Sequence, residues 1–141
     1  MGTTHLDDLV VGSIEVSGVA TVGGLSNTGS STASVAVGIT AHAGGGQASA
    51  TALTATIDSV DTVATAADSV ALPLAVAGLV RYVTNNTANS MQVFGSGTDT
   101  INIGAGDVAT ATGVAQAANK SAIYFCIKSA PAGKWERVIT A

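Results

Sequence analysis

Short runs of apolar residues, many of them β-branched or aromatic, recur from residue 48 onward and are separated by segments rich in turn residues, which is the pattern of short β-strands. The clearest run is Leu79–Thr84. The turn-rich segment Asn85–Ser90 follows it, and Met91–Gly95 is a second apolar run, so we expect these two runs to form a hairpin. A last pair of strands is expected at Ser121–Lys128 and Lys134–Ile139.

The middle of the chain predicts further short strands. Thr51–Ile57 has small or apolar residues at alternate positions, and Asp58 and Asp61 are expected around a turn that follows it. Shorter strands are expected at Thr62–Thr65, Ser69–Pro73 and Gly97–Gly104. Short strands at this spacing predict an all-β fold, with an antiparallel β-sandwich or jelly-roll-like domain over residues 47–141.

The first 46 residues differ from the rest, because they contain ten of the seventeen glycines and lack the bulk to bury a core of their own. We expect an extended Gly/Ser/Thr-rich arm over residues 1–46, hinged at Gly44–Gly46, that serves oligomerisation or capsid attachment. A short β-prism of several chains and a disordered tail are the alternatives. The candidate partner-binding residues of the arm are Leu9, Val10, Val11, Ile14, Val16, Val19 and Val22.

Composition favours strands and excludes several classes of partner. Charged residues make up only 10% of the chain, against about 25% in typical soluble domains. The net charge is -4 and the basic residues form no run, so direct nucleic-acid binding is not expected. The longest weakly apolar stretch, Val70–Val80, is short and interrupted by Pro73 and Gly78, so a membrane span is not expected either. The amino terminus has no signal-peptide pattern.

Residues that could carry chemistry are sparse. His5 and His42 have no second His or Cys at ligand spacing, so we expect neither a metal site, nor a cofactor, nor catalytic residues. The single Cys126 is expected to be a buried thiol, and the aspartates are expected to cap turns. Trp135 is either a core anchor on the last strand or an exposed sugar-stacking platform, and the flanking Val138 and Ile139 favour the core.

Six segments, taken in order, resemble a module of tailed-phage virion proteins. They are Gly46–Thr54, Asp68–Pro73, Val80–Asn85, Gln92–Phe94, Asp99–Asn102 and Gly133–Trp135. The module is similar to segments of capsid decoration (cement) proteins and of some fibre proteins, and the resemblance covers residues 45–141.

The resemblance implies a non-enzymatic virion protein, made in the bacterial host cytoplasm, that stabilises the head by binding the outer surface of the major capsid protein shell. A homo-oligomer, in particular a trimer around a three-fold axis, is expected. The alternative is a tail fibre, spike or baseplate component whose β domain binds a host surface glycan, with Tyr82, Phe94 and Trp135 as the candidate contact residues.

Overall fold

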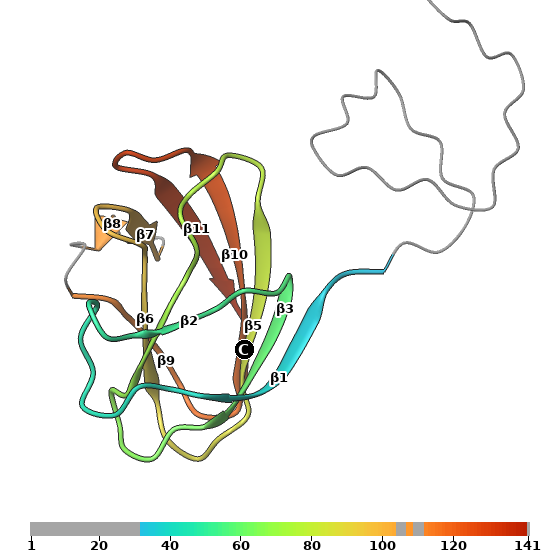
Figure 1. Ribbon diagram of the computed structural model, residues 1–141, viewed down its shortest axis with the longest axis vertical. Coiled ribbons are helices and arrows are strands. Elements are labelled where there is room, and N and C mark those ends of the chain that lie inside the picture. Colours follow the sequence, from blue (N-terminus) through green and yellow to red (C-terminus); the bar gives the residue numbers. More distant parts are fainter. Residues whose placement is uncertain (1–31, 104–106, 109–111, 141) are drawn as a thin grey trace, which may run out of the picture. The chain divides into compact units, whose positions relative to one another are not determined.

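The computed structural model describes residues 32–103, 107–108 and 112–140, and these residues form eleven β-strands (Figure 1). The strands are β1 (Val35–Thr40), β2 (Thr51–Ala52), β3 (Ile57–Thr62), β4 (Ser69–Ala71), β5 (Val80–Asn85), β6 (Met91–Phe94), β7 (Thr100–Asn102), β8 (Asp107–Val108), β9 (Val114–Gln116), β10 (Lys120–Lys128) and β11 (Lys134–Ile139). In this part of the chain no helix is long and apolar enough to span a membrane. The expectation of an all-β fold is confirmed.

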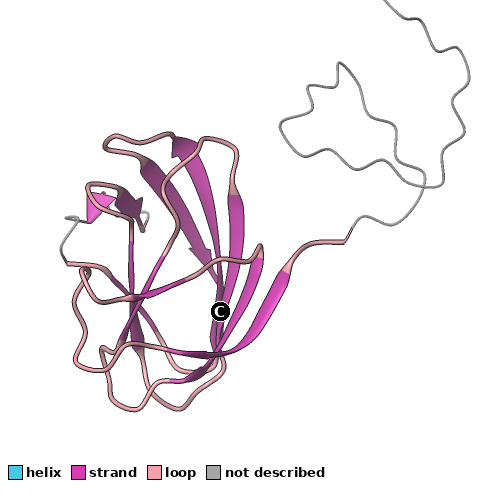
Figure 2. Cartoon of the chain, viewed as in Figure 1, coloured by secondary structure: helices cyan, strands magenta, loops and turns pink. Residues whose placement is uncertain are grey.

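The strands form two mixed sheets (Figure 2). One has seven strands in the order β1-β3-β5-β10-β11-β7-β8, and the other has four in the order β2-β4-β6-β9. The expected antiparallel arrangement is wrong for the first half of the domain, because β1, β3 and β5 pair in parallel, as do β2, β4 and β6. Antiparallel pairing begins where β10 joins β5 and β9 joins β6.

The parallel pairing follows from the path of the chain, which alternates between the two sheets from β1 to β6. Each odd-numbered strand lies in the larger sheet and the next even-numbered strand lies in the smaller one. The chain thus completes three coils, β1–β2, β3–β4 and β5–β6, and the second and third coils each hydrogen-bond to the coil before them. A parallel neighbour requires such a crossover, because a tight turn can join only antiparallel strands.

The predicted hairpin between Leu79–Thr84 and Met91–Gly95 is therefore wrong, since β5 and β6 belong to different sheets. The segment between them is a crossover held by side-chain amides. Asn85 Nδ2 donates to the carbonyls of Asn89 and Gln116 at 2.9 and 3.2 Å. Asn89 Nδ2 in turn donates to the Val63 carbonyl at 2.9 Å, in the crossover between β3 and β4. Asn-rich segments are typical of tight turns, but here the Asn side chains hold the longer connection that runs from one sheet to the other.

Asp58 and Asp61 also lie elsewhere than predicted, because both are in β3 rather than in a turn. The chain bends before β3, and only Thr51–Ala52 of the predicted strand Thr51–Ile57 is extended as β2. Asp58 is fully buried and accepts a hydrogen bond from the amide of Ala55 at 3.2 Å. Asp58 lies in β3, and its carboxylate thus caps the bend that precedes this strand. The loss of hydration raises the pKa of the Asp58 carboxyl.

Part of the predicted arm belongs to the sheet. Val35–Thr40 lies within residues 1–46, yet as β1 it pairs with β3. The predicted hinge at Gly44–Gly46 is also tied to the domain, since the Gly44 amide donates to Asp68 Oδ1 at 3.1 Å and the Gly46 carbonyl accepts from Ser69 Oγ at 3.0 Å. All three glycines have positive φ, which explains the residue type. Residues 1–31 of the predicted arm lie outside the described residues.

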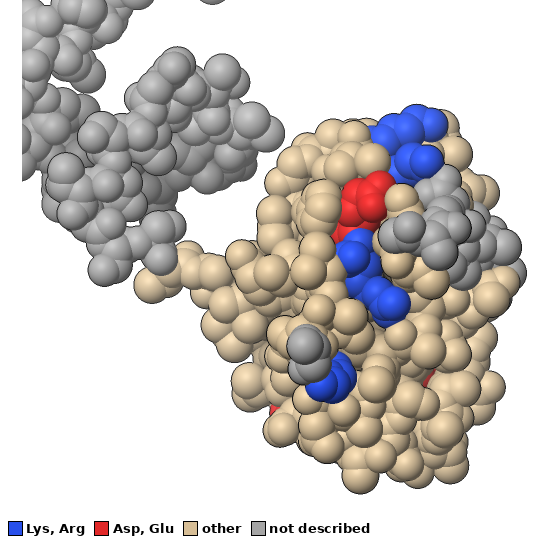
Figure 3. Space-filling model, turned by 180° about the vertical axis from the view of Figure 1, so that it is seen from behind, with Lys and Arg blue, Asp and Glu red and all other residues tan. Residues whose placement is uncertain are grey.

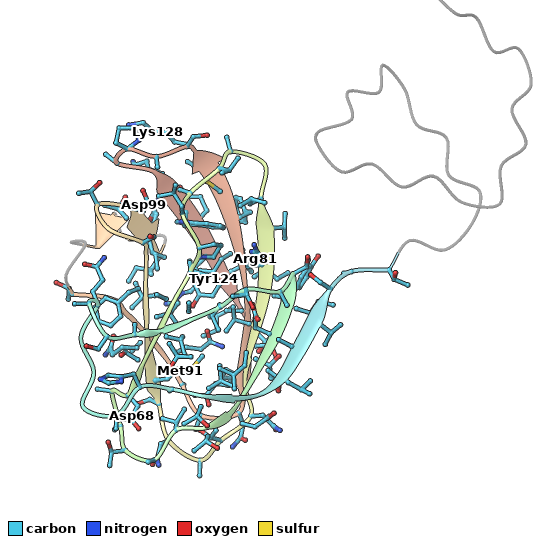
Figure 4. The ribbon with its side chains drawn as sticks, viewed as in Figure 1. Asp68, Arg81, Met91, Asp99, Tyr124 and Lys128 are labelled. Carbon is cyan, nitrogen blue, oxygen red and sulfur yellow. The ribbon has the colours of Figure 1, made fainter. Side chains whose placement is uncertain are left out.

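Side chains from both sheets fill one core. Tyr124 of β10 and Met91 of β6 point into the space between the sheets (Figure 4). The predicted last pair is confirmed as an antiparallel hairpin of β10 and β11, in which Cys126 lies opposite Trp135. Both side chains are buried, as the sequence predicted for the thiol and for the core-anchor reading of Trp135. Burial raises the pKa of the Cys126 thiol.

Candidate interaction surface

The outward face of β10 is apolar, although it is exposed. Ala122, Tyr124 and Cys126 point into the core, and the residue that follows each of them points outward. The outward residues are Ile123, Phe125 and Ile127, which keep 37, 36 and 52% of their surface exposed. A strand in a sheet with one solvated face alternates apolar and polar residues, whereas a near-continuous apolar run is typical of a strand covered on both faces. By this criterion β10 has the sequence of a covered strand.

The neighbouring strands extend this apolar face across the sheet. Register places five outward apolar residues side by side on five adjacent strands, and we call them the apolar row. Its members are Val35 of β1, Ile57 of β3, Tyr82 of β5, Ile123 of β10 and Val138 of β11. Each keeps between 37 and 61% of its surface exposed. Residues directly opposite each other on adjacent strands share one face of a sheet, so the row is continuous.

A second set of apolar side chains widens the row on one side. Phe125 of β10 lies opposite Val80 of β5, and both are more than one-third exposed. On the other neighbouring strand, β11, Glu136 lies opposite Phe125. The Glu136 carboxylate accepts a hydrogen bond from Asn102 Nδ2 at 3.2 Å. The apolar area therefore ends at a polar margin on the β11 and β7 side.

Hydroxyl groups border the apolar row on its other side. Ser59, Thr84 and Ser121 lie opposite one another on β3, β5 and β10. Thr84 Oγ1 and Ser121 Oγ are 3.0 Å apart and share a hydrogen bond. The surface is thus an apolar band with hydroxyl groups along one side and with Glu136 and Asn102 at its β11 end. An apolar centre with polar groups at its margin is typical of a protein–protein interface.

Charged residues make up only 10% of the sequence. On the face shown in Figure 3, the described Lys, Arg, Asp and Glu cover only small areas. Asp61, at the end of β3, uses its carboxylate within the domain, since it accepts from the Gly38 amide at 2.6 Å and from Asn86 Nδ2 at 3.1 Å. These hydrogen bonds lower the pKa of the Asp61 carboxyl, and the one from Asn86 has the largest effect.

Large exposed apolar patches on soluble domains mark sites of interaction.

The residues singled out from the sequence fall in different places. The seven candidate partner-binding residues of the arm lie outside the described residues. Of the three aromatic candidates for glycan binding, Trp135 and Phe94 are buried, and only Tyr82 is exposed. The reading of Trp135 as a sugar-stacking platform is therefore wrong.

The polar candidates are mostly structural. His42 is exposed, and its backbone pairs with Ser69. Asp99 is buried and caps loops as predicted, because its carboxylate accepts from the amides of Ala75 and Gly133 at 2.9 and 2.8 Å. Within the described residues, His, Cys, Asp and Glu form no group of three or more that could hold a metal ion.

The apolar row is the feature that sequence reasoning missed. A signal for it was present in the unbroken apolar run Ala122–Ile127, which exceeds what one buried face requires. The other members of the row come from strands far apart in sequence, so only the register of the sheet brings them together. Comparison of the chain with models of known protein families, with curated proteins and with solved structures found no match.

Proposed function

We propose that this protein is a non-enzymatic structural protein that decorates a phage capsid, and that it attaches to the outer surface of the major capsid protein through the apolar row. The observation that carries the proposal is the row itself, five apolar side chains in register on five adjacent strands, all of them exposed. The phage context rests on the resemblance of residues 45–141 to virion proteins.

The physical character of the surface supports a long-lived protein partner. Burial of apolar area contributes roughly 25 cal/mol per Å², and it needs no charge pairing to be favourable. The core of a stable interface is poor in charged residues and rich in aromatic ones. Tyr82 and Phe125 supply the aromatic surface here, and no member of the row is charged.

Assembly of several copies would strengthen attachment. A trimer placed on a symmetry axis of a shell presents three copies of the surface at once, and the second and third contacts then form within one complex. Weak individual contacts become a tight attachment in this way. Low charge also avoids repulsion between neighbouring copies on a crowded shell.

Co-sedimentation with undecorated capsids tests the proposal. The purified protein, whose native mass is measured first, is mixed with capsids over a range of concentrations and pelleted. Saturable binding at a fixed ratio to the major capsid protein is expected. A folded protein that stays in the supernatant at every concentration would refute the decoration role.

The exposed Tyr82 favours a second candidate function, host-glycan binding by a tail fibre or baseplate component. An exposed aromatic ring beside hydroxyl groups suits a sugar, because the ring stacks on the apolar face and the hydroxyls exchange hydrogen bonds. Tyr82 is 45% exposed, and Thr84 follows it two residues later on the same face of β5. Binding to host-cell polysaccharide that is lost in Tyr82→Ala, without binding to capsids, would support this function instead.

A further inference from the structure

Three members of the apolar row lie near the start of their strands. Val35 is the first residue of β1, Ile57 is the first of β3, and Tyr82 is the third of β5. The ends of strands open locally more easily than their centres, because fewer hydrogen bonds hold them. The positions of these three side chains therefore depend on what holds the adjoining backbone.

One bend connects the three strands at this end. Residues 53–56 lead from β2 into β3, and the last of them, Thr56, hydrogen-bonds to both neighbouring strands. Its amide donates to Ser34 Oγ at 2.9 Å, and its carbonyl accepts from the Tyr82 amide at 2.9 Å. The next amide, that of Ile57, donates to the Ser34 carbonyl at 3.0 Å. The bend thus locates the start of β1 and of β5 as well as that of β3.

Two side chains hold the bend at Ala55, which is buried. Asp58 Oδ1 accepts from the Ala55 amide at 3.2 Å. From β5, Arg81 Nη1 donates to the Ala55 carbonyl, and also to the Thr54 carbonyl at 3.3 Å (Figure 4). Both polar backbone groups of Ala55 therefore have a partner. Because an unpaired buried backbone group is costly, these contacts favour one position of the bend.

The register places both of these residues directly beneath the row. Ile57 lies opposite Tyr82, Asp58 follows Ile57, and Arg81 precedes Tyr82. Successive side chains of a strand point to opposite faces of the sheet, so Asp58 and Arg81 lie on the core side while the two row members point outward. Asp58 is fully buried and Arg81 is half-buried.

We propose that Asp58 and Arg81 are positioning residues for the apolar row, which fix the 53–56 bend and thereby the outward positions of Val35, Ile57 and Tyr82. Buried charged groups are a weak source of stability, and in some proteins they fix one arrangement of the chain among several. The positioning follows from contacts within the domain, whereas its importance for attachment rests on the proposed function.

Amide hydrogen exchange in the full-length chain tests the proposal. Arg81→Met removes the donor to the bend and keeps a long side chain. The amides of Ile57 and Tyr82 should then exchange roughly two- to tenfold faster, as expected for the loss of a hydrogen bond, while amides in the β10–β11 hairpin keep their rates. Arg81→Lys retains a donor and should restore slower exchange, and this milder change serves if Arg81→Met does not fold.

Arg137→Met is the matched control. Arg137 is also half-buried, and its Nη1 donates to a backbone carbonyl at 2.6 Å, but that carbonyl belongs to Ala115 of β9. The control should leave the Ile57 and Tyr82 amides unchanged. For the second positioning residue, Asp58→Asn retains an acceptor for the Ala55 amide and should exchange more slowly at Ile57 than Asp58→Leu. Circular dichroism first establishes which variants are folded.

Unchanged exchange at Ile57 and Tyr82 in folded Arg81→Met would overturn the proposal. An equal acceleration of all amides would overturn it as well, because it would show a contribution to overall stability and no local positioning. Co-sedimentation of the same variants with undecorated capsids separates the two claims. Weaker binding of Arg81→Met than of Arg137→Met is expected. Local acceleration with undiminished capsid binding would uphold the positioning and count against attachment through the row.

Discussion

The Tyr124 hydroxyl donates a hydrogen bond to Gln116 Oε1 at 2.9 Å in the interior of the domain, where both side chains are fully buried. The Gln116 amide nitrogen completes the network by donating to the carbonyls of Val83 and Lys120, both at 2.9 Å. One side chain thus links β9 to β5 and to the start of β10. Burial raises the pKa of the Tyr124 hydroxyl above its ordinary value, which favours the protonated form that donates this hydrogen bond.

We predict that Tyr124→Phe lowers the free energy of unfolding by about 1–3 kcal/mol, because Gln116 Oε1 is left buried without a donor. Urea denaturation followed by circular dichroism measures the change. Tyr82→Phe is the matched control, since Tyr82 is exposed, and it should change stability by less than about 0.5 kcal/mol. Equal effects of the two substitutions would contradict the role of the network.

Trp135 is a core anchor, and its removal should be costly. Trp135→Ala should lower the free energy of unfolding by about 3–5 kcal/mol, because it leaves a large cavity between β10, β7 and the second sheet. Trp135→Phe should cost much less, since the ring fills most of the space and the indole N–H has no hydrogen-bond partner among the described residues. An unchanged melting temperature in the alanine variant would place Trp135 at the surface.

The Asp99 carboxylate connects two loops through the amides of Ala75 and Gly133. Asp99→Asn replaces one acceptor oxygen by an NH₂ group, so one of these buried amides loses its partner. The expected loss is about 1–3 kcal/mol in the free energy of unfolding. Faster hydrogen exchange at Ala75 or Gly133, compared with amides in the centre of β5, would localise the effect. Unchanged exchange at both amides would show that the carboxylate is dispensable.

Asp68 should contribute to acid sensitivity. The Thr65 amide, followed by the Thr65 hydroxyl, hydrogen-bonds to the carboxylate and lowers its pKa below the ordinary value of 3.8. The folded state therefore favours the ionised form, and the resulting stability is present above pH 3.8 and is lost as the pH falls below it. Melting temperatures measured from pH 6 to pH 2 should be lower for Asp68→Asn than for the parent at pH 6, and the difference in melting temperature should become smaller as the pH falls. A difference that stays constant with pH would contradict this linkage.

Local pattern predicted several of the strands but not their partners. Ser69–Ala71, Val80–Asn85 and the β10–β11 hairpin were expected close to where they lie, because short apolar runs and nearby turn residues specify them. The hairpin of β5 with β6 was wrong because the partners of these strands lie more than twenty positions away, and nothing in a short window shows a crossover between sheets. The apolar row was missed for the same reason.

The most direct test of the central claim compares two variants in capsid binding. Ile123→Lys places a charge in the middle of the apolar row, and Thr84→Lys places the same charge in the adjacent hydroxyl margin, at a partly exposed position. Both variants should remain folded, because neither side chain belongs to the core. The account predicts that Ile123→Lys no longer co-sediments with undecorated capsids, whereas Thr84→Lys retains at least part of the binding. Full binding of folded Ile123→Lys would contradict attachment through the apolar row.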